Sequence, residues 1–297
     1  WMTRNRDLMV TVKEALAKGS QLLAQQQSSD TRLDTQVLLG HVIGAERAQL
    51  LAYPERDISN EQFERYWQLI ARRARGEPVA YLTGHKEFFG LDFCVDRRVL
   101  IPRPETELLV EAALGVIGDR IAAGSLPVVA DIGTGSAAIA ITIAVKEPRL
   151  PYLYACDISA EALEVARLNC LRHHVETRVR LLQGDLLAPL PEPIDVLVAN
   201  LPYVGTDEMA SIAPDVLDYE PHAALFSGPY GLSHLRRLFV EAAQSDMLKR
   251  GGGLLLEIGY QQCEPLTNLL HELWPQAQVI CQQDYAGWDR LIQVLLL

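Results

Sequence analysis

Apolar residues in the second half of the chain form seven short runs that alternate with helical patterns. The first four runs are rich in Val, Leu, Ile and Ala and lack strict alternation, which is typical of strands buried on both faces of a parallel sheet. The runs span residues 128–132, 153–158, 179–182, 195–199, 253–258, 277–281 and 291–297. Helical patterns occupy about residues 136–146, 159–173, 231–249 and 263–273. This order predicts a doubly wound, seven-stranded, Rossmann-like α/β sheet, whose ligand should lie beyond the carboxyl ends of the strands.

The first part of the chain has a helical pattern instead. Apolar residues from Leu8 onward recur at near-helical spacing, and two further helices are predicted after Thr31 and Ser59. Each of these residues precedes an acidic or amide residue by three positions (Asp34 and Gln62), which is the pattern of a capping box. Because no catalytic chemistry is visible here, we expect a small helical bundle that binds a partner.

A short β-hairpin is predicted between the helical and the α/β parts, since residues 87–89 and 91–95 flank Gly90. Two prolines then interrupt the pattern before the next helix. The predicted domains are a helical substrate-binding domain (residues 1–76), a hairpin linker (77–104) and an α/β domain (105–297).

The net charge of −11 comes from the part of the chain after residue 95. Residues 1–95 carry 12 basic and 12 acidic residues, whereas the remainder carries 15 basic and 26 acidic ones. A protein that binds nucleic acid usually presents a basic face, so we expect no direct nucleic-acid partner. The longest nearly unbroken apolar run, residues 137–145, falls short of the roughly 20 residues of a membrane span. The N-terminus also lacks the apolar region of a secretion signal, and we expect a cytoplasmic protein without membrane contact.

The five cysteines and seven histidines are dispersed along the chain. Because no CxxC pair occurs, the cysteines indicate neither a disulfide framework nor a zinc site. We expect reduced thiols and no bound metal.

A glycine-rich loop directly follows the first predicted strand. It reads Asp131-Ile132-Gly133-Thr134-Gly135-Ser136-Ala137. Its glycines permit a tight turn and the close approach of a ligand. A dinucleotide site has the pattern GxGxxG, with helix amides directed at a pyrophosphate. Here an acidic residue stands two positions before the first glycine, and acidic residues suit a cationic sulfonium better than a pyrophosphate.

Acidic residues also end the next two predicted strands. Asp157 lies 24 positions after Gly133 and could accept hydrogen bonds from two ribose hydroxyls. Alternatively, Asp157 and Ser159 cap the following helix. Asp185, which precedes Leu186, could accept a hydrogen bond from an adenine amino group. Three consecutive strands that each end in an acid favour a ligand site.

The fourth predicted strand ends in Asn200-Leu201-Pro202-Tyr203. An amide nitrogen is a poor nucleophile because its lone pair is delocalised into the carbonyl. The Asn200 side-chain oxygen and the carbonyl of residue 201, placed in line with its N–H bonds, would orient the nitrogen and take up developing positive charge. Tyr203 would supply an aromatic wall for the planar group. We therefore expect Asn200, Pro202 and Tyr203 to be catalytic.

The tetrapeptide resembles the Asn-Pro-Pro-Tyr motif of nitrogen methyltransferases, and further motifs make the resemblance closer. They are Tyr81-Leu82-Thr83-Gly84, Glu87-Phe88-Phe89-Gly90, Leu100-Ile101-Pro102-Arg103-Pro104-Glu105-Thr106-Glu107, Tyr219-Glu220-Pro221 with Ala224-Leu225, Gly252-Gly253-Leu254-Leu255-Leu256-Glu257-Ile258-Gly259, and the group Asp284, Gly287, Asp289 and Arg290. In this order they are similar to the release-factor glutamine methyltransferases, also called the HemK or PrmC family, over roughly residues 30–293.

The resemblance implies N5-methylation of the glutamine in the Gly-Gly-Gln motif of class I peptide-chain release factors, with S-adenosylmethionine as cofactor and S-adenosylhomocysteine as product. The helical domain would help to hold the release factor. Carried over by position, the cofactor contacts would be Asp131, Gly133, Thr134, Gly135, Ser136, Ala137, Asp157, Asp185, Leu186 and Asn200. The substrate amide would contact Asn200, Leu201, Pro202 and Tyr203.

Two positions depart from the family's pattern. Ala137 stands where a third glycine is usual, which is costly if its φ is positive. Leu201 stands where a first proline is usual, and its backbone carbonyl keeps the expected acceptor while the fixed φ of proline is lost. We expect an active enzyme.

Two alternatives stay open. A methyltransferase for exocyclic amino groups of DNA or RNA would use the same chemistry, but the neutral front domain lacks a basic or aromatic-rich recognition surface. The second alternative is a cofactor-binding scaffold that Ala137 and Leu201 have disabled.

Overall fold

The computed structural model describes residues 10–25 and 30–296. They form two compact units: the first runs to Gly84 and includes Ala213–Tyr219, and the second comprises residues 85–212 and 220–296. The sequence assigned residues 77–104 to a linker, whereas the structure places residues 77–84 in the first unit and the hairpin in the second. Each unit has its own hydrophobic core and is described by itself.

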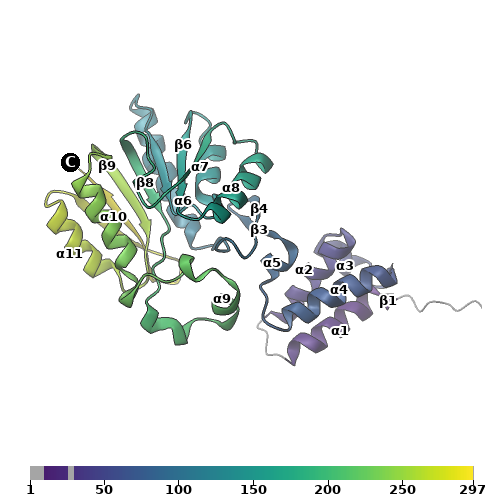
Figure 1. The fold of residues 1–297 in the computed structure, drawn as a ribbon. Coiled ribbons are helices and arrows are strands. Elements are labelled where there is room, and N and C mark those ends of the chain that lie inside the picture. The colour runs from purple at the N-terminus through teal and green to yellow at the C-terminus, as the bar shows by residue number, and fades with distance from the viewer. Residues whose placement is uncertain (1–9, 26–29, 297) are drawn as a thin grey trace, which may run out of the picture. The chain divides into compact units, whose positions relative to one another are not determined.

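The first unit is a small helical bundle (Figure 1). Its elements are β1 (Val10–Thr11), α1 (Val12–Ala24), α2 (Thr31–Ile43), α3 (Arg47–Ala52), β2 (Asp57–Ile58), α4 (Asn60–Arg73), α5 (Val79–Thr83) and α9 (Pro214–Tyr219). Apolar side chains of α1, α2 and α4 form its core, in which Leu38, Tyr66 and Ile70 are fully buried. The predicted helices are therefore confirmed, except that Leu8 lies outside the described residues.

The capping box predicted at Ser59 is confirmed, but the one predicted at Thr31 is wrong. Ser59 Oγ accepts a hydrogen bond from the Gln62 N–H at 3.1 Å, and Gln62 Oε1 accepts one from the Ser59 N–H at 2.9 Å. At the start of α2, the capping residue makes no side-chain cap bond. The Asp34 carboxylate instead accepts a hydrogen bond from Arg73 Nε of α4 at 2.7 Å, because a tertiary ion pair takes the group that a local box would use.

The second unit contains the predicted seven-stranded sheet, which confirms the fold class. Its strands are β5 (Val129–Ile132), β6 (Leu153–Asp157), β7 (Val179–Gln183), β8 (Ile194–Ala199), β9 (Leu248–Glu257), β10 (Gln278–Gln283) and β11 (Asp289–Leu295). They lie in the order β10-β11-β9-β8-β5-β6-β7, in which β5 to β9 are parallel and β11 is antiparallel to both neighbours. The strand order reverses between β5 and β8, which is where a doubly wound sheet binds its ligand.

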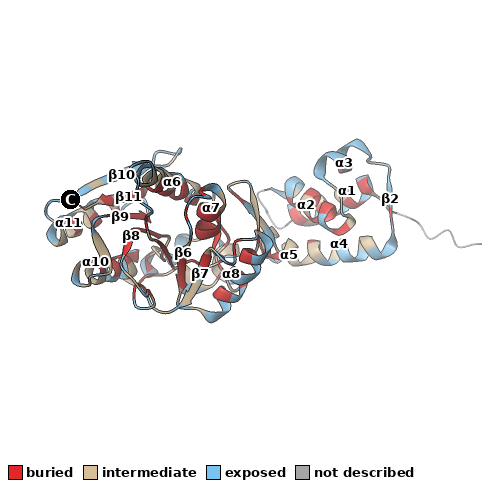
Figure 2. Cartoon of the chain, turned by 90° about the horizontal axis from the view of Figure 1, so that it is seen from above, coloured by how far each residue is buried: buried red, intermediate tan, exposed pale blue. Residues whose placement is uncertain are grey.

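Helices cover both faces of this sheet (Figures 1 and 2). They are α6 (Thr106–Ala122), α7 (Ala138–Lys146) and α8 (Ala160–Arg172) on one face, and α10 (Ser233–Gln244) and α11 (Cys263–Leu273) on the other. Alternate residues of β8 serve the two cores: Val196 and Val198 pack in the first, and Leu197 and Ala199 in the second. Burial on both sides explains why the central strands are continuous apolar runs.

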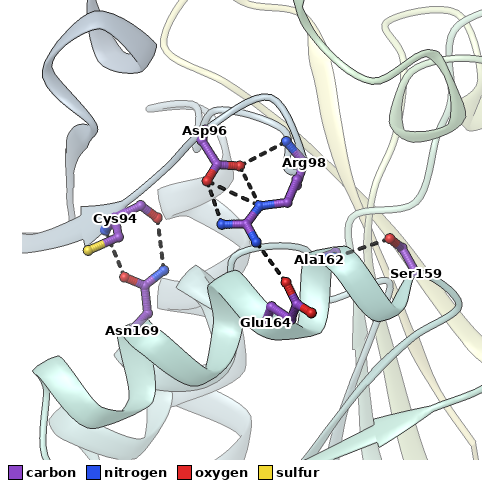
Figure 3. A network of polar contacts seen from close by, with 7 residues as sticks. All are labelled: Cys94, Asp96, Arg98, Ser159, Ala162, Glu164 and Asn169. Atoms are coloured by element: carbon purple, nitrogen blue, oxygen red, sulfur yellow. Dashed lines mark hydrogen bonds and ion pairs between the residues drawn. The ribbon is translucent and has the colours of Figure 1, made fainter.

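The hairpin of β3 (His85–Phe88) and β4 (Leu91–Cys94) is anchored to the sheet unit. Phe88 is buried in the core that α6, α7 and α8 cover. The buried Asn169 of α8 accepts a hydrogen bond from the Cys94 N–H at 2.7 Å and donates one to the Cys94 carbonyl at 3.0 Å (Figure 3). The hairpin is therefore held by both packing and backbone pairing.

The expectation of five reduced thiols is wrong at two positions. A disulfide joins Cys263, at the start of α11, to Cys281 in β10, with Cα atoms 6.4 Å apart. The two residues lie 18 positions apart without a motif between them, and they become neighbours only because α11 packs beside β10. Cys94, Cys156 and Cys170 are free thiols.

Two absences concern only the part of the chain that the structure describes. No helix there combines the length and the hydropathy that crossing a membrane requires. No cluster of three or more His, Cys, Asp or Glu side chains there is arranged to hold a metal ion.

Gly19→Ala in α1 should destabilise the first unit. A Cβ at Gly19 would lie 2.1 Å from the Tyr66 hydroxyl oxygen, which is buried and has no hydrogen-bond partner among the described residues. We expect a loss of about 1–3 kcal/mol in the free energy of unfolding, the usual cost of overpacking. Gly118→Ala in α6 is the control: its Cβ would meet no heavy atom within 4 Å, and it should stabilise its helix by about 0.5–1 kcal/mol.

Tyr66→Phe should restore much of the stability lost in the Gly19→Ala variant, since it removes both the clashing oxygen and an unsatisfied buried polar group. Chemical denaturation of the single and double variants measures this effect. A Gly19→Ala protein as stable as the parent would contradict the packing of α1 against α4.

Candidate active site

A cavity of about 250 Å³ lies at the carboxyl ends of β5, β6 and β8. Its wall includes four segments that the sequence predicted: residues 133–136, Asp157, residues 185–186 and residues 200–202. The cavity wall also includes residues from two further segments, 98–106 and 221–224. The structure thus brings most of the predicted site residues together. Asp131, Ala137 and Tyr203 do not line this cavity.

Ion pairs hold the segments that close the cavity. Arg98 pairs with Glu164 of α8 at 2.8 Å (Figure 3). Arg103 pairs with Glu220, whose side chain is 1% exposed, and the second carboxylate oxygen of Glu220 accepts a hydrogen bond from the Ile101 N–H at 3.1 Å. The motif around Glu220 therefore fixes the motif around Arg103, although sequence reasoning assigned neither residue a role.

The glycine loop has the backbone conformation for which glycine is suited. The φ angles of Gly133 and Gly135 are +75° and +55°. The N–H groups of Gly133 and Thr134 both donate to the Cys156 carbonyl at 2.9 Å. A Cβ at Gly133 would approach the Leu201 side chain to 2.7 Å, so the loop after β5 and the loop after β8 pack closely against each other.

Ala137 occupies a left-handed conformation, with a φ of +61°. This conformation costs a residue with a Cβ roughly 1–2 kcal/mol. The Ala137 methyl group is fully buried in the core beside α7, and burying one methyl contributes about 0.8 kcal/mol. Part of the strain is therefore offset by packing that a glycine could not provide.

Asp131 lies beneath the loop and is fully buried. Its Oδ2 accepts a hydrogen bond from Thr134 Oγ1 at 2.6 Å, and its Oδ1 has no hydrogen-bond partner within the described residues. Burial raises the pKa of Asp131 to about 7. A cation bound above the loop would favour the ionised carboxylate, which fits a sulfonium cofactor.

Asp157 connects the glycine loop to the start of α8. Its Oδ2 accepts a hydrogen bond from the Gly135 N–H at 2.8 Å, and its Oδ1 accepts one from the Ser159 N–H at 2.9 Å. Burial raises the pKa of Asp157, while these N–H groups lower it. Ser159 is the residue that caps α8, through the Ala162 N–H at 3.1 Å. Each Asp157 oxygen keeps a second lone pair with which a ribose hydroxyl could bind.

The far end of the cavity combines an ion pair with apolar surface. Asp185 pairs with Arg237 of α10 at 2.5 Å, so its carboxylate already has a cationic partner. Leu186 has a φ of +46° and is nearly buried. Ile158, which sequence reasoning missed although it follows Asp157 directly, lines the cavity and is 68% exposed. An exposed apolar side chain in a cavity wall offers a surface for an adenine ring.

Two groups from distant parts of the chain hold the Asn200 side chain. Its Nδ2 donates to Thr106 Oγ1 at 3.1 Å and to Glu257 Oε2 at 3.0 Å. Thr106 Oγ1 donates in turn to Glu257 Oε2 at 2.6 Å. Both Thr106 and Glu257 are buried. The sequence offered one signal for Glu257, since it ends the buried run of β9 just as Asn200 follows β8, and these two strands are neighbours.

Tyr203 points away from the main cavity. Its hydroxyl donates to Glu257 Oε1 at 2.9 Å, and the residue lines a neighbouring cavity together with Tyr230 and Gln262. Gln262 Nε2 donates to the carbonyls of Tyr203 and Tyr230 at 2.8 and 3.1 Å, which fixes the course of the loop after Asn200.

The strand order and the acidic glycine loop together define the class I methyltransferase domain. Two features of the site fit S-adenosylmethionine: the glycines with positive φ leave room for close approach, and the Asp157 carboxylate in the cavity wall keeps lone pairs for a ribose. Residues 133–136, Asp157 and Ile158 would hold this cofactor.

Comparisons with known proteins identify the family. Residues 14–84 match the PrmC N-terminal domain and residues 117–220 match the methyltransferase small domain. The chain is 42% identical over 282 residues to the release factor glutamine methyltransferase of Moorella thermoacetica and 38% identical over 286 residues to that of Koribacter versatilis. Each match covers 95% of this chain, with 97% and 98% of the respective relatives. The chain belongs to the release factor glutamine methyltransferase family, whose members are S-adenosylmethionine-dependent enzymes.

Solved structures agree on the fold. The hMettl16 catalytic domain in complex with an RNA hairpin is 16% identical, with a TM-score of 0.54, and the match covers 82% of this chain and 83% of that one. The N-terminal domain of human METTL16 in complex with SAH is also 16% identical, with a TM-score of 0.51 and coverage of 81% and 85%. At this identity the likeness establishes the fold alone.

Ala137→Gly should change the free energy of unfolding by less than about 1 kcal/mol. The relief of roughly 1–2 kcal/mol of strain is offset by a lost methyl (about 0.8 kcal/mol) and by about 0.4–1 kcal/mol of added entropy in the unfolded chain. Ala137→Val should lose more than about 2 kcal/mol, because a β-branched residue is an outlier at positive φ. Urea unfolding of both variants tests this balance. A gain of more than about 1 kcal/mol for Ala137→Gly would show that the strain at this residue outweighs the packing of its methyl group.

Leu201→Pro, which introduces the family's usual residue, should lower stability. The Leu201 side chain is 5% exposed and packs in the core beneath α10 and α11. Losing this packing costs about 1–3 kcal/mol, more than the roughly 0.4–1 kcal/mol that a compatible proline adds. Leu201→Ala is the control and should lose about 2–5 kcal/mol. Thermal unfolding ranks the three proteins, and a Leu201→Pro variant more stable than the parent would refute the importance of this packing.

Proposed function

We propose that this protein transfers the methyl group of S-adenosylmethionine to the side-chain amide nitrogen (N5) of a glutamine, the one in the Gly-Gly-Gln motif of class I peptide-chain release factors. This chain matches the release factor glutamine methyltransferases named above over almost their whole length. The helical unit, which matches the PrmC N-terminal domain, would help to hold the release factor.

The orientation of Asn200 is the observation that carries this proposal. Its Nδ2 is engaged by Thr106 and Glu257, and a side-chain amide carries its carbonyl oxygen on the opposite branch. Asn200 also lines the main cavity. Its Oδ1 is therefore the group available to accept a hydrogen bond from a substrate N–H.

An acceptor at this position would compensate for the low nucleophilicity of an amide nitrogen. The amide lone pair is delocalised, and the nitrogen gains positive charge as it attacks. The Asn200 Oδ1 and the carbonyl of Leu201 would each accept one N–H, which fixes the plane of the substrate amide and stabilises the developing charge. The nitrogen would receive the electrophilic methyl group that the bound cofactor supplies, S-adenosylhomocysteine would be left, and the nitrogen would release one proton to water.

The same acceptors would suit an exocyclic amino group of a nucleobase, and the charge near the site favours the protein substrate. Residues 200–219 carry four Asp or Glu residues and no Lys or Arg. This tract contains the Asn200 loop and the residues that follow it. A polyanion would be repelled here, whereas a basic protein segment would be attracted.

Labelled S-adenosylmethionine offered to a class I release factor, to its Gln→Ala variant at the Gly-Gly-Gln motif, and to DNA and RNA tests the proposal. We expect label in the first alone, with the added mass on the glutamine side chain. Label in the Gln→Ala variant or in nucleic acid would contradict the proposal.

We expect Asn200→Ala to lower mainly the turnover number and Asp157→Asn to lower mainly the affinity for the cofactor. Asn200→Ala should lower kcat by roughly 100- to 1,000-fold, as for a single preorganised hydrogen-bonding group, and leave cofactor affinity nearly unchanged. Asp157→Asn replaces a charged acceptor that Gly135 and Ser159 bind, so it should weaken cofactor binding by about 1.5–3 kcal/mol and affect kcat less. Calorimetry with S-adenosylhomocysteine and single-turnover rates separate the two effects. If both variants lost affinity equally, Asn200 would belong to the cofactor site instead.

A further inference from the structure

Glu257 is a buried acid to which no step of the reaction described so far gives a function. It ends β9, it is 1% exposed, and it receives three hydrogen bonds. Its Oε2 accepts from Thr106 Oγ1 at 2.6 Å and from Asn200 Nδ2 at 3.0 Å. Its Oε1 accepts from the Tyr203 hydroxyl at 2.9 Å. Two residues of the Asn200–Tyr203 loop are thus bound to one carboxylate.

A carboxylate can only accept hydrogen bonds, and this fixes the direction of the Asn200 amide. If Asn200 were turned by 180°, its Oδ1 would face Glu257 Oε2, and two acceptors would meet in a buried site. Thr106 reinforces the same choice. Its single hydroxyl hydrogen is donated to Glu257, so its oxygen is left to accept the second Nδ2 hydrogen of Asn200 at 3.1 Å.

We propose that Glu257 is a positioning residue for methyl transfer: its carboxylate, with Thr106 as a second contact, locks the Asn200 amide so that Oδ1 faces the nitrogen to be methylated. This inference rests on the proposed function, since it concerns the same acceptor. Glu257 acts through Asn200 and does not itself touch the substrate.

The surroundings of Glu257 determine whether it carries the required charge. Burial raises the pKa of Glu257, and the charge of Glu105 raises it further. The hydrogen bonds from Thr106 and Tyr203 and the positive charge of Arg290 lower this pKa. Arg290 of β11 is itself held by Asp284, whose Oδ2 accepts a hydrogen bond from Arg290 Nε at 3.2 Å. The Asp284–Arg290 pair belongs to a motif to which the sequence analysis assigned no role. Through Arg290, this pair favours the charged state of Glu257.

Protonation of Glu257 would remove the constraint on the orientation of the Asn200 amide. A neutral Glu257 has a hydroxyl that can donate, so the Asn200 amide could turn and direct its NH₂ group at the substrate. Two donors would then face each other, and the substrate nitrogen would lose its acceptor. Because the pKa of Glu257 is raised, kcat should fall with decreasing pH at values above the ordinary range of a glutamate.

Glu257→Gln keeps the size of the side chain, removes its charge and replaces one of its two acceptor oxygens by an NH₂ group that donates. We expect kcat to fall by roughly 10- to 100-fold, part of the loss expected on removing Asn200 itself, while the Kd for S-adenosylhomocysteine stays within about twofold. The matched control is Glu192→Gln. Glu192 also accepts hydrogen bonds from two tyrosines, Tyr152 and Tyr154, and does not line the cavity, so its kcat should equal that of the parent.

A reciprocal exchange distinguishes positioning from general structural support. In Asn200→Asp, two carboxylates compete, and kcat should be very low. In the double variant Asn200→Asp with Glu257→Gln, the amide introduced at position 257 can donate to one carboxylate oxygen of residue 200 and leave the other to accept the substrate N–H. We expect kcat of the double variant to exceed that of either single variant by at least about tenfold. Additive losses would overturn the proposal.

Two further measurements keep the test decisive if Glu257→Gln folds poorly. Thr106→Val should lower kcat without loss of cofactor affinity, and Thr106→Ser, which keeps the hydroxyl, should restore it. The acid limb of the kcat profile that belongs to Glu257 should disappear in Glu257→Gln, whereas any limb from Asp131 would persist in both proteins. Unchanged kcat in both Glu257→Gln and Thr106→Val would show that Asn200 is oriented by something else.

These outcomes are separate from failure of the proposed function, because every comparison is made with the nitrogen substrate that the parent protein methylates. A parent that methylates nucleic acid but not a release factor would overturn the proposed substrate and leave the Glu257 comparison intact.

Discussion

The parallel arrangement of β5, β6, β8 and β9 is the constraint from which the site follows. Parallel strands end at the same edge, so the residues at their carboxyl ends become neighbours however far apart they are in sequence. Asp131, Asp157, Asn200 and Glu257 occupy these four ends. The glycine loop after β5 packs on Leu201 after β8, and the residues that end β8 and β9 form a charged hydrogen bond. In the proposed function, the cofactor would lie at the ends of β5 and β6, and the substrate at the ends of the adjacent pair β8 and β9.

The fold could be predicted because its signal is local. Continuous apolar runs mark strands buried on both faces, and the alternation of Val196, Leu197, Val198 and Ala199 between two cores shows why such runs are largely apolar. The glycine loop and the Asn200 tetrapeptide could be predicted for a related reason, since each lies within a few residues of a strand end. The box at Ser59 was predictable because its two partners are three residues apart.

The features that could not be predicted from the sequence depend on contacts between residues far apart in the chain, which no short sequence pattern encodes. Thr106 and Glu257 meet Asn200 over sequence separations of 94 and 57 residues. The same holds for the Cys263–Cys281 disulfide and for Asp34, which pairs with Arg73 rather than with the start of its own helix. The direction of Tyr203 was also unpredictable, because the buried carboxylate that its hydroxyl contacts comes from the neighbouring strand.

In the proposed mechanism, Asn200 presents its carbonyl oxygen to the substrate because Glu257 holds its NH₂ group. A crystal structure with S-adenosylhomocysteine and a Gly-Gly-Gln peptide would measure this directly. We expect the glutamine side-chain nitrogen to lie about 3 Å from Asn200 Oδ1, with Asn200 Nδ2 still bound to Glu257. A glutamine nitrogen out of reach of Asn200, or an Asn200 amide turned with its NH₂ group toward the peptide, would contradict it.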